Sequence, residues 1–372
     1  MAVALAVEFA DELVDGVKSA AMPAVQHSLG ISYAQVGLLT AVPLLVGGVL
    51  ELPAGLVTNR RAAITGGGVL FVLSLVGMAF AQNFAELVIA ITLFFPASGF
   101  FVSLTQASLM DAEPDRQAQL MARWDATGWV GAVCGPLLLV AVLAAGGSWR
   151  TAFLAVATVA ALALVGVLKY GGGGHDEEEG QERTRVRDVL AGARTAWRWL
   201  LLLEVADLLV DVLSGFVALY LVRVAHTTTV LAAIAVAARL GAGLAGDALL
   251  IVALRRFSDL AILRAGAAAA ALLYPAFLLV PGLPAKIILL TLLSAVTATW
   301  YPLLEARLYG AVPSSVAVTL NTASGMAAAA GPLAVGVAAG VFGLPWALGG
   351  LAVVPVLLLA CIWRAGGPSV RS

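Results

Sequence analysis

The feature that most constrains the fold of this chain is a series of twelve apolar runs, separated by polar residues or by Gly and Pro. An α-helix needs about 20 apolar residues to cross roughly 30 Å of hydrocarbon, and the runs have about that length. Only 12% of the residues are charged, against about 25% in an ordinary soluble domain. We therefore predict an all-α membrane protein with twelve transmembrane helices. The runs lie near residues 2–25, 33–57, 62–81, 84–110, 122–145, 149–169, 199–222, 229–253, 259–281, 285–309, 315–340 and 344–364.

Two of these runs carry acids on one helical face. The two sets are Glu8, Asp11 and Asp15 in the first run and Glu204, Asp207 and Asp211 in the seventh. Residues at i, i+3 and i+7 lie on one side of an α-helix. The differences 204 − 8, 207 − 11 and 211 − 15 all equal 196. The same offset relates three further pairs: Glu51 and Asp247, Arg60 and Arg256, and Gly135-Pro136 and Gly331-Pro332.

A repeat of this length in an apolar chain predicts two pseudo-symmetric six-helix bundles. Parallel repeats of this kind build one class of membrane transporter. The predicted domains are an N-terminal bundle over residues 1–170, a cytoplasmic linker over 171–198 and a C-terminal bundle over 199–372. The linker holds four consecutive glycines, an acidic run and five arginines. We expect a flexible start followed by a surface-lying segment, because this composition cannot support a core.

Several functional classes lack support. The net charge of −1 and the absence of a basic domain argue against nucleic-acid binding. Cys134 and Cys361 lie in apolar runs outside any CxxC or Cys/His cluster, which argues against a disulfide frame or a zinc site. We place His27, His175 and His226 in loops, where they form no nitrogen-rich metal site. No Walker motif, nucleophile-base pair or metal-ligand spacing is present, so we predict no enzyme activity, cofactor or bound metal.

The basic residues predict the orientation, because loops rich in Lys and Arg remain cytoplasmic. With a cytoplasmic N-terminus, fifteen basic residues lie on the inner side and only Arg150, Arg223 and Lys286 lie outside. Both termini are then cytoplasmic. The first run has no basic stretch before it and is interrupted by acids, so we interpret it as a membrane helix rather than a signal peptide.

Short motifs resemble one transporter family. Those in the first third are Asp15-Gly16, Met22-Pro23, Leu29-Gly30-Ile31-Ser32, Gln35-Val36-Gly37-Leu38-Leu39 and the segment from Gly55 to Arg61. Together they resemble the first two helices and connecting loop of bacterial major facilitator superfamily transporters. Ser148-Trp149-Arg150, leading into Phe153, is similar to the start of their sixth helix. The resemblance implies the MFS fold, alternating access around a central site, a monomer in the bacterial inner membrane, and contacts with lipid and a small-molecule substrate.

The family's loop after the second helix carries Gly-x-x-x-Asp-Arg-x-Gly-Arg-Arg, whose Asp and Arg lock the inner gate. Here Asn59 replaces that Asp and the second Gly is missing, which implies a weaker or rebuilt lock. Alternatively, Arg60 and Arg61 only set the topology. We predict that eight residues take part in gating: Glu51, Asn59, Arg60, Arg61, Gln106, Asp247, Glu305 and Arg307. For Gln106, Glu305 and Arg307, the alternative is a polar side chain that reaches the membrane surface.

Glycines in the fifth helix, Gly128, Gly131 and Gly135 before Pro136, resemble the Gly/Pro motif of drug-proton antiporters. Close helix packing explains them equally well. The fourth helix lacks the membrane-embedded Arg typical of those antiporters, which argues against this assignment. Trp300, Tyr301 and Asn321 are further candidates for lining the cavity, although packing is the commoner role of aromatic residues in apolar helices.

The repeated acids indicate ion or substrate handling. An ionised acid at mid-membrane costs roughly 2.5–3.5 kcal/mol, so these side chains need water or partners. Crowded, buried carboxylates also bind protons more readily. We therefore predict a substrate and proton site at Glu8, Asp11, Asp15, Glu204, Asp207, Asp211 and Arg239. The structural alternative is that the acids pair with Lys18, Arg239 and helix ends. Arg239, whose repeat-mate is Pro43, would partner an acid or an anionic group. The alternative is an ion pair with Asp247, although two helical turns are too far for a direct contact within one straight helix.

These observations predict a secondary active transporter coupled to protons, and one specific form is an exporter of cationic or drug-like compounds. Carboxylates outnumber Lys18, the basic residue of the first and seventh runs, which favours cationic or proton-exchanging solutes. One alternative is a divalent metal cation transporter, since oxygen ligands suit hard cations. Another is a non-transporting membrane receptor on the same scaffold.

Overall fold

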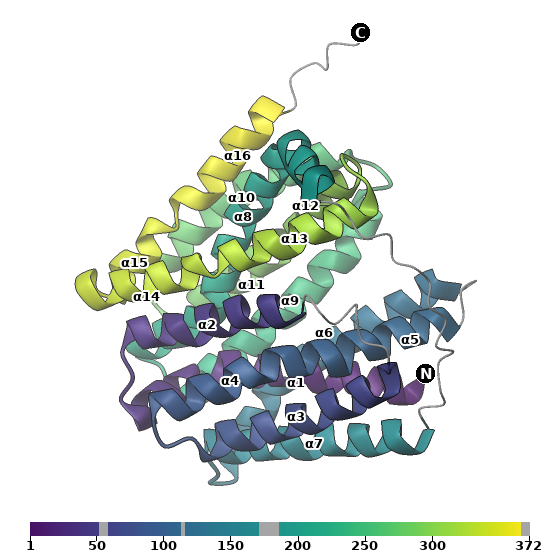
Figure 1. Cartoon of the computed structure of the whole chain (residues 1–372). Helices are drawn as coiled ribbons and strands as arrows, with labels where there is room; N and C mark the ends of the chain where they lie inside the picture. The colour runs from purple at the N-terminus through teal and green to yellow at the C-terminus, as the bar shows by residue number, and fades with distance from the viewer. Residues whose placement is uncertain (52–58, 113–115, 171–185, 366–372) are drawn as a thin grey trace. The chain divides into compact units, whose positions relative to one another are not determined.

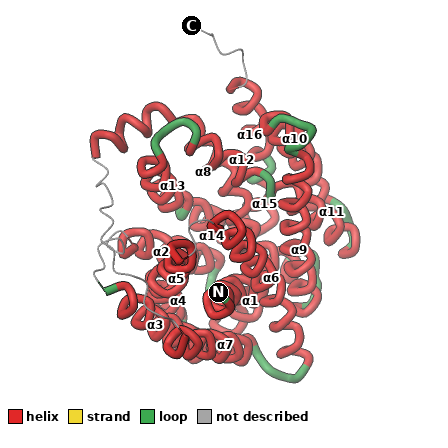
Figure 2. The backbone as a smooth tube through the Cα atoms, turned by 90° about the vertical axis from the view of Figure 1, so that its right-hand side faces the viewer, coloured by secondary structure: helices red, strands yellow, loops and turns green. Residues whose placement is uncertain are grey.

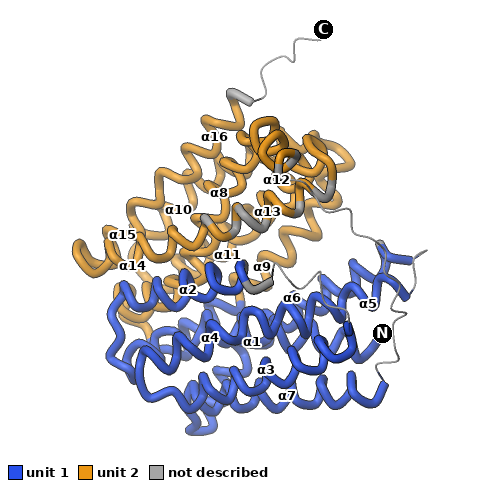
Figure 3. Tube along the Cα trace, viewed as in Figure 1, with its two compact units in different colours: residues 1–180, 228–237 blue, residues 181–227, 238–372 orange. Residues whose placement is uncertain are grey.

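The computed structural model describes residues 1–51, 59–112, 116–170 and 186–365. These residues form helices and the turns that connect them, with no strand in the described ranges (Figure 2). The chain divides into two compact units (Figure 3). Unit 1 comprises residues 1–180 and 228–237, and unit 2 comprises residues 181–227 and 238–372.

Unit 1 begins with one long helix and continues through six further helices and a π-helical turn (Figure 1). These elements are α1 (Ala2–Leu29), α2 (Tyr33–Glu51), α3 (Arg60–Phe80), α4 (Phe84–Ser98), η2 (Gly99–Ser103), α5 (Leu104–Ala112), α6 (Gln117–Ala144) and α7 (Trp149–Tyr170). Gly30 ends α1 with a left-handed conformation, φ 62°, which glycine adopts without the steric cost of a Cβ atom. Asn83 begins α4 by accepting a hydrogen bond from the Glu86 amide, at 3.0 Å.

Unit 2 repeats this order with more breaks. Its helices are α8 (Val186–Arg223), α9 (Thr229–Ala253, whose first turns group with unit 1), α10 (Asp259–Leu279), α11 (Leu283–Thr297), α12 (Trp300–Tyr309), α13 (Ser314–Ala328), α14 (Ala330–Phe342), α15 (Leu344–Gly350) and α16 (Val353–Ala365). Helices α3 and α10 each have 21 residues, and α4 and α11 each have 15. In both units the fourth apolar run is interrupted, by η2 in unit 1 and by the turn between Thr297 and Trp300 in unit 2.

Nine described helical spans are long and apolar enough to cross a membrane. They are Arg60–Phe80, Phe84–Ala112, Gln119–Ala144, Trp149–Tyr170, Val189–Arg223, Thr229–Ala253, Asp259–Leu279, Leu283–Tyr309 and Leu344–Trp363. Helices α2 and α14 contribute shorter apolar segments, Tyr33–Gly47 and Ala330–Phe342. Helix α1 has 28 residues and is long enough, but it carries too many charged side chains to be counted among these apolar spans. These segments agree with the predicted all-α membrane fold and are consistent with twelve crossings.

The predicted domain boundaries remain a prediction. Residues 171–185 of the predicted linker lie outside the described residues, and residues 186–198 form the first turns of α8. One histidine position is corrected: His27, expected in a loop, lies in the last turn of α1. His226 lies in the connection after α8, and His175 lies outside the described residues.

Close packing of glycines holds α1 against α6. A Cβ atom on Gly16 would lie 2.3 Å from the Ala132 carbonyl oxygen, and one on Gly135 would lie 2.6 Å from the Val17 amide nitrogen. Small residues let membrane helices approach this closely and so gain van der Waals contact. The glycines that resembled an antiporter motif are therefore part of a helix contact within unit 1.

Basic side chains satisfy helix ends at two places. In unit 1, Arg150 Nη2 donates to the carbonyl oxygen of Ala81, the C-cap residue that follows α3, at 2.8 Å. In unit 2, the buried Lys286 Nζ donates to the carbonyl oxygens of Phe277 and Leu278 in the last turn of α10, each at 2.9 Å. The last carbonyls of a helix lack partners within the helix and favour a nearby cation.

We expect Gly135→Ala to destabilise the protein, because the added methyl group meets backbone atoms of α1 that cannot rotate away. Overpacking of this kind costs about 1–3 kcal/mol. The apparent melting temperature of detergent-purified protein should fall.

The matched control is Gly66→Ala on α3, where a Cβ atom meets nothing within 4 Å. This variant should be at least as stable as the wild type, because Ala is the better helix former by about 1 kcal/mol. Equal melting temperatures for both variants would contradict the close contact between α1 and α6.

Candidate functional site

The acids of α1 have different surroundings although they share one helix. Asp15 is largely exposed and forms an ion pair with Lys18, at 2.5 Å. The Lys18 ammonium also lies 5.6 Å from the ring centroid of Phe95 on α4. Asp11 accepts a hydrogen bond from the Ser98 hydroxyl at the end of α4, at 2.9 Å. The Asp15–Lys18 pair is a local contact between residues three positions apart on one helix.

Glu8 points toward α6. Its side chain is only 8% exposed, and its Oε1 atom lies 2.5 Å from the position that a Cβ atom on Gly128 would occupy. The negative charges of Asp11 and of Asp125 on α6 act on it. Asp125 was not among the predicted residues. The repeat would have singled it out, because 125 + 196 = 321, and Asn321 belongs to the polar cluster of unit 2.

The acids of α8 contact a polar cluster formed with α12 and α13. Ser324 donates a hydrogen bond to Glu204. Asn321 donates to the Tyr301 hydroxyl at 2.9 Å and to Glu305 Oε1 at 3.2 Å. The charges of Glu204, Asp211 and Glu305 all act on Asp207. Unit 2 therefore brings predicted site residues together with Glu305, a predicted gating residue.

Arg239 contributes a buried guanidinium to unit 2. Its side chain is 6% exposed, and its Nη2 donates to the Ser214 hydroxyl on α8 at 3.0 Å. Its Nη1 has no hydrogen-bond partner among the described residues. The charge of Asp211, three residues before Ser214, acts on it. Because 18 + 196 = 214, Ser214 occupies the position of Lys18, so the cation near this Asp comes from a neighbouring helix.

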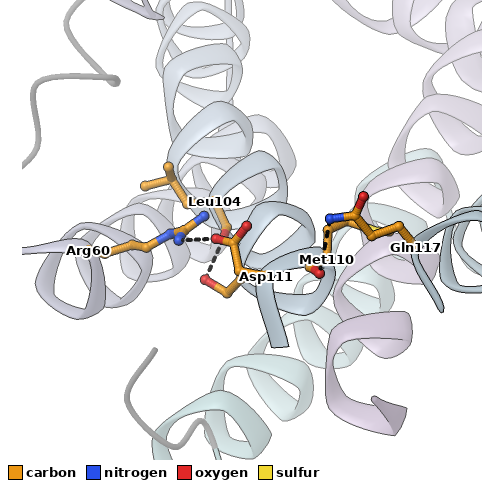
Figure 4. Close-up of polar contacts among 6 residues, drawn as sticks. Arg60, Leu104, Met110, Asp111 and Gln117 are labelled. Atoms are coloured by element: carbon orange, nitrogen blue, oxygen red, sulfur yellow. Dashed lines mark hydrogen bonds and ion pairs between the residues drawn. The ribbon is translucent and has the colours of Figure 1, made fainter. Parts of the chain in front are cut away.

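Two of the predicted gating residues form ion pairs at equivalent helix ends. In unit 1, Arg60 at the start of α3 pairs with Asp111 near the end of α5, at 2.6 Å (Figure 4). In unit 2, Asp259 at the start of α10 pairs with Arg307 near the end of α12, at 2.5 Å. Each unit thus links its third membrane helix to its fourth, with the order of the charges reversed. Neither Asp111 nor Asp259 was predicted from the sequence.

The other predicted gating residues have varied surroundings. Asn59 accepts a hydrogen bond from the Ala62 amide at 2.9 Å and so caps α3. Arg61 is exposed, and Gln106 Nε2 lies 3.4 Å from the Met121 sulfur. Asp247 is half-buried on α9. The side chain of Glu51, at the end of α2, lies outside the described residues, as do residues 52–58 of the loop motif.

A metal site finds no support in the described residues. No group of three or more His, Cys, Asp or Glu side chains is placed to hold a metal ion there. Among the aromatic candidates for lining a cavity, Trp300 is fully buried, whereas Tyr301 is 39% exposed and bonded to Asn321.

Comparison with known proteins gives one family and a set of similar folds. Residues 5–319 match the family model described as Major Facilitator Superfamily. The bacterial homologue of the human lysosomal transporter Spinster, in an inward-facing and unoccupied conformation, is 16% identical with a TM-score of 0.79, and 97% of this chain and 95% of that chain are covered. A point mutant of the nucleoside transporter NupG is 10% identical with a TM-score of 0.82, covering 98% and 99%.

A D-xylose-proton symporter is also similar, with 16% identity, a TM-score of 0.79, and coverage of 97% and 96%. At these identities the structures are evidence for the fold alone. No curated protein matches the chain significantly.

We expect the protein to tolerate an exchange of the two charges in the Arg60–Asp111 pair. Asp111→Arg alone should lower the melting temperature, because two guanidinium groups would face each other. Adding Arg60→Asp recreates the charge order of unit 2 and should restore stability. Both side chains are partly exposed, 29% and 64%, so a double-mutant cycle should give a coupling of about 0.2–1 kcal/mol. Strictly additive effects would mean that the pair contributes no interaction energy.

Proposed function

Because the chain belongs to the Major Facilitator Superfamily, we propose that it is a secondary active transporter that moves a small solute by alternating access between its halves. Family membership confirms the expectation of a membrane transporter rather than an enzyme. The finer proposal concerns coupling and substrate.

We propose that protons drive transport. The supporting observation is that the first membrane helix of each half, α1 and α8, carries repeated acids that the surrounding apolar residues cannot stabilise. Glu8 and Asp207 each lie near other carboxylates. Crowded acids exchange protons more readily than isolated, solvated ones. A D-xylose-proton symporter has a similar fold, which supports the proposal through fold-level analogy.

The balance of charge favours a cationic solute. In α1, Glu8, Asp11, Glu12 and Asp15 accompany one lysine, and α8 adds three acids within its apolar part. Such an excess attracts cations. Export of cationic or drug-like compounds is the specific form we propose, by a monomer in the bacterial inner membrane with both termini in the cytoplasm. The two ion pairs at the starts of α3 and α10 are the proposed gating contacts, together with the remaining predicted gating residues.

We predict that Asp15→Asn and Asp211→Asn each abolish proton-driven transport while leaving the protein folded, because the amide removes a negative charge from the acidic set of its helix. Reconstituted protein is assayed for uptake of a lipophilic organic cation under an imposed pH gradient, and folding is checked by thermal unfolding. The matched control is Glu86→Gln, which removes a carboxylate from the first turn of α4, outside both acidic sets. It should retain coupling. Normal pH-driven transport by the Asp15→Asn, Asp211→Asn double variant would show that these acids are structural.

The substrate class has its own test. Uptake of a lipophilic organic cation is compared with uptake of manganese and magnesium in the same vesicles. We expect transport of the organic cation, since no metal-ligating group of three side chains occurs in the described residues. Transport of an anion that is lost in Arg239→Gln would show that the guanidinium selects the substrate, and would overturn the proposal.

A further inference from the structure

The two repeat-related glutamates Glu8 and Glu204 differ in one respect that the sequence repeat makes visible. In unit 2, Glu204 accepts a hydrogen bond from Ser324. In unit 1, the position equivalent to Ser324 is Gly128, since 324 − 196 = 128. The Glu8 side chain lies directly against Gly128. The same carboxylate position therefore has a hydroxyl donor in one half and none in the other.

Glu8 has no hydrogen-bond donor within the described part of the chain. The Glu8 residue is only 8% exposed, so its carboxylate is not solvated as one on the surface would be. A buried carboxylate without a donor is stable only when it is protonated or when a cation lies beside it. The local structure of unit 1 thus leaves the Glu8 carboxylate able to take up a proton or a cation.

A second residue difference between the two repeats also affects the charge state of Glu8. Asp125 in unit 1 corresponds to Asn321 in unit 2, which donates to Tyr301 and Glu305. An amide donates hydrogen bonds and carries no charge, whereas a carboxylate only accepts them and repels Glu8. Both substitutions between the repeats therefore favour a neutral Glu8 over an ionised one.

We propose that Glu8 is the proton-exchanging carboxyl of unit 1, that Asp125 controls its proton affinity, and that Ser324 holds its repeat-mate Glu204 as a hydrogen-bonded anion. In the exchange, the O–H bond of the Glu8 carboxyl breaks, the proton passes to water, and the carboxylate retains the electron pair. This assignment deepens the proposed proton coupling and rests on it for its role in transport.

The groups that face Glu8 come from two helices. Asp11 acts on it from α1, where Glu12 is also coupled to it, and Asp125 acts on it from α6. Within the described residues, α5, α7 and η2, which also pack against α1, add no charge that acts on Glu8. All three neighbouring groups are carboxylates, so none of them stabilises the Glu8 anion.

The test measures proton binding directly and needs no substrate. Infrared difference spectra of purified protein are recorded across pH, and the carbonyl band of protonated carboxyl groups is followed. We expect Glu8→Gln to remove one titrating component of this band, and Glu204→Gln to leave that component in place. Retention of the full titrating band in folded Glu8→Gln protein would overturn the assignment.

Two milder variants keep the proposal testable where Glu8→Gln fails to fold. Gly128→Ser gives Glu8 the hydroxyl donor that Glu204 has, and the atom it approaches is the mobile end of the Glu8 side chain. Asp125→Asn introduces the residue of the second repeat and removes a repelling charge. Each should move the titration to lower pH by about one unit, since hydrogen bonds to charged groups and close charges have effects of that order.

Ser324→Gly is the reciprocal change. It should make a new carboxyl titrate in unit 2, because Glu204 then loses its donor. Unchanged titrations in Gly128→Ser, Asp125→Asn and Ser324→Gly would contradict the proposal even if transport is driven by protons. Conversely, a Glu8 titration that moves as expected in a protein without proton-driven transport would refute the proposed coupling and leave the assignment of Glu8 intact.

Discussion

The structure depends on one constraint: a charge inside an apolar helix needs a partner or access to water. The described residues satisfy this constraint in different ways. Asp15 pairs with a lysine on its own helix, whereas the matching Asp211 is influenced by an arginine from another helix. Glu204 accepts a hydrogen bond from a hydroxyl. Lys286 donates to two carbonyl oxygens and to the Tyr220 hydroxyl. Glu8 is a buried acid for which the described part of the chain provides no such partner.

The same constraint bears on the close approach of α1 and α6. Two acids of α1, Glu8 and Glu12, face α6, where glycines stand in place of larger side chains. The glycines at 128, 131 and 135 allow backbone contact and at the same time leave room for the carboxylates of Glu8 and Glu12. Packing and chemistry therefore use the same residues, and a side chain added at these positions affects both.

The sequence predicted the parts of the fold that depend on run length and repetition. The apolar runs predicted the membrane helices. The constant offset between Glu8 and Glu204 predicted that the second half repeats the helix order of the first. Breaks such as η2 were missed because hydropathy does not register a local change of helix type. Asp111 and Asp259 were missed because their partners are 51 and 48 positions away in the chain. The cap formed by Asn59 was predictable, since Asn commonly begins helices. We assigned Asn59 to gating instead, because it replaces the Asp of the family motif.

The reversed order of the two ion pairs has a consequence for the history of the chain. If the halves descend from one duplicated segment, Asp111 and its repeat-mate Arg307 have come to carry opposite charges, and the partner on the third membrane helix differs as well: Arg60 corresponds to Arg256, whereas Asp259 corresponds to Ala63. Changing a single member to the opposite sign would place two like charges together, which costs stability. The easier route passes through an uncharged residue at one of the two positions. A neutral pair at this contact in a relative would therefore represent a stage on that route rather than a loss of the contact.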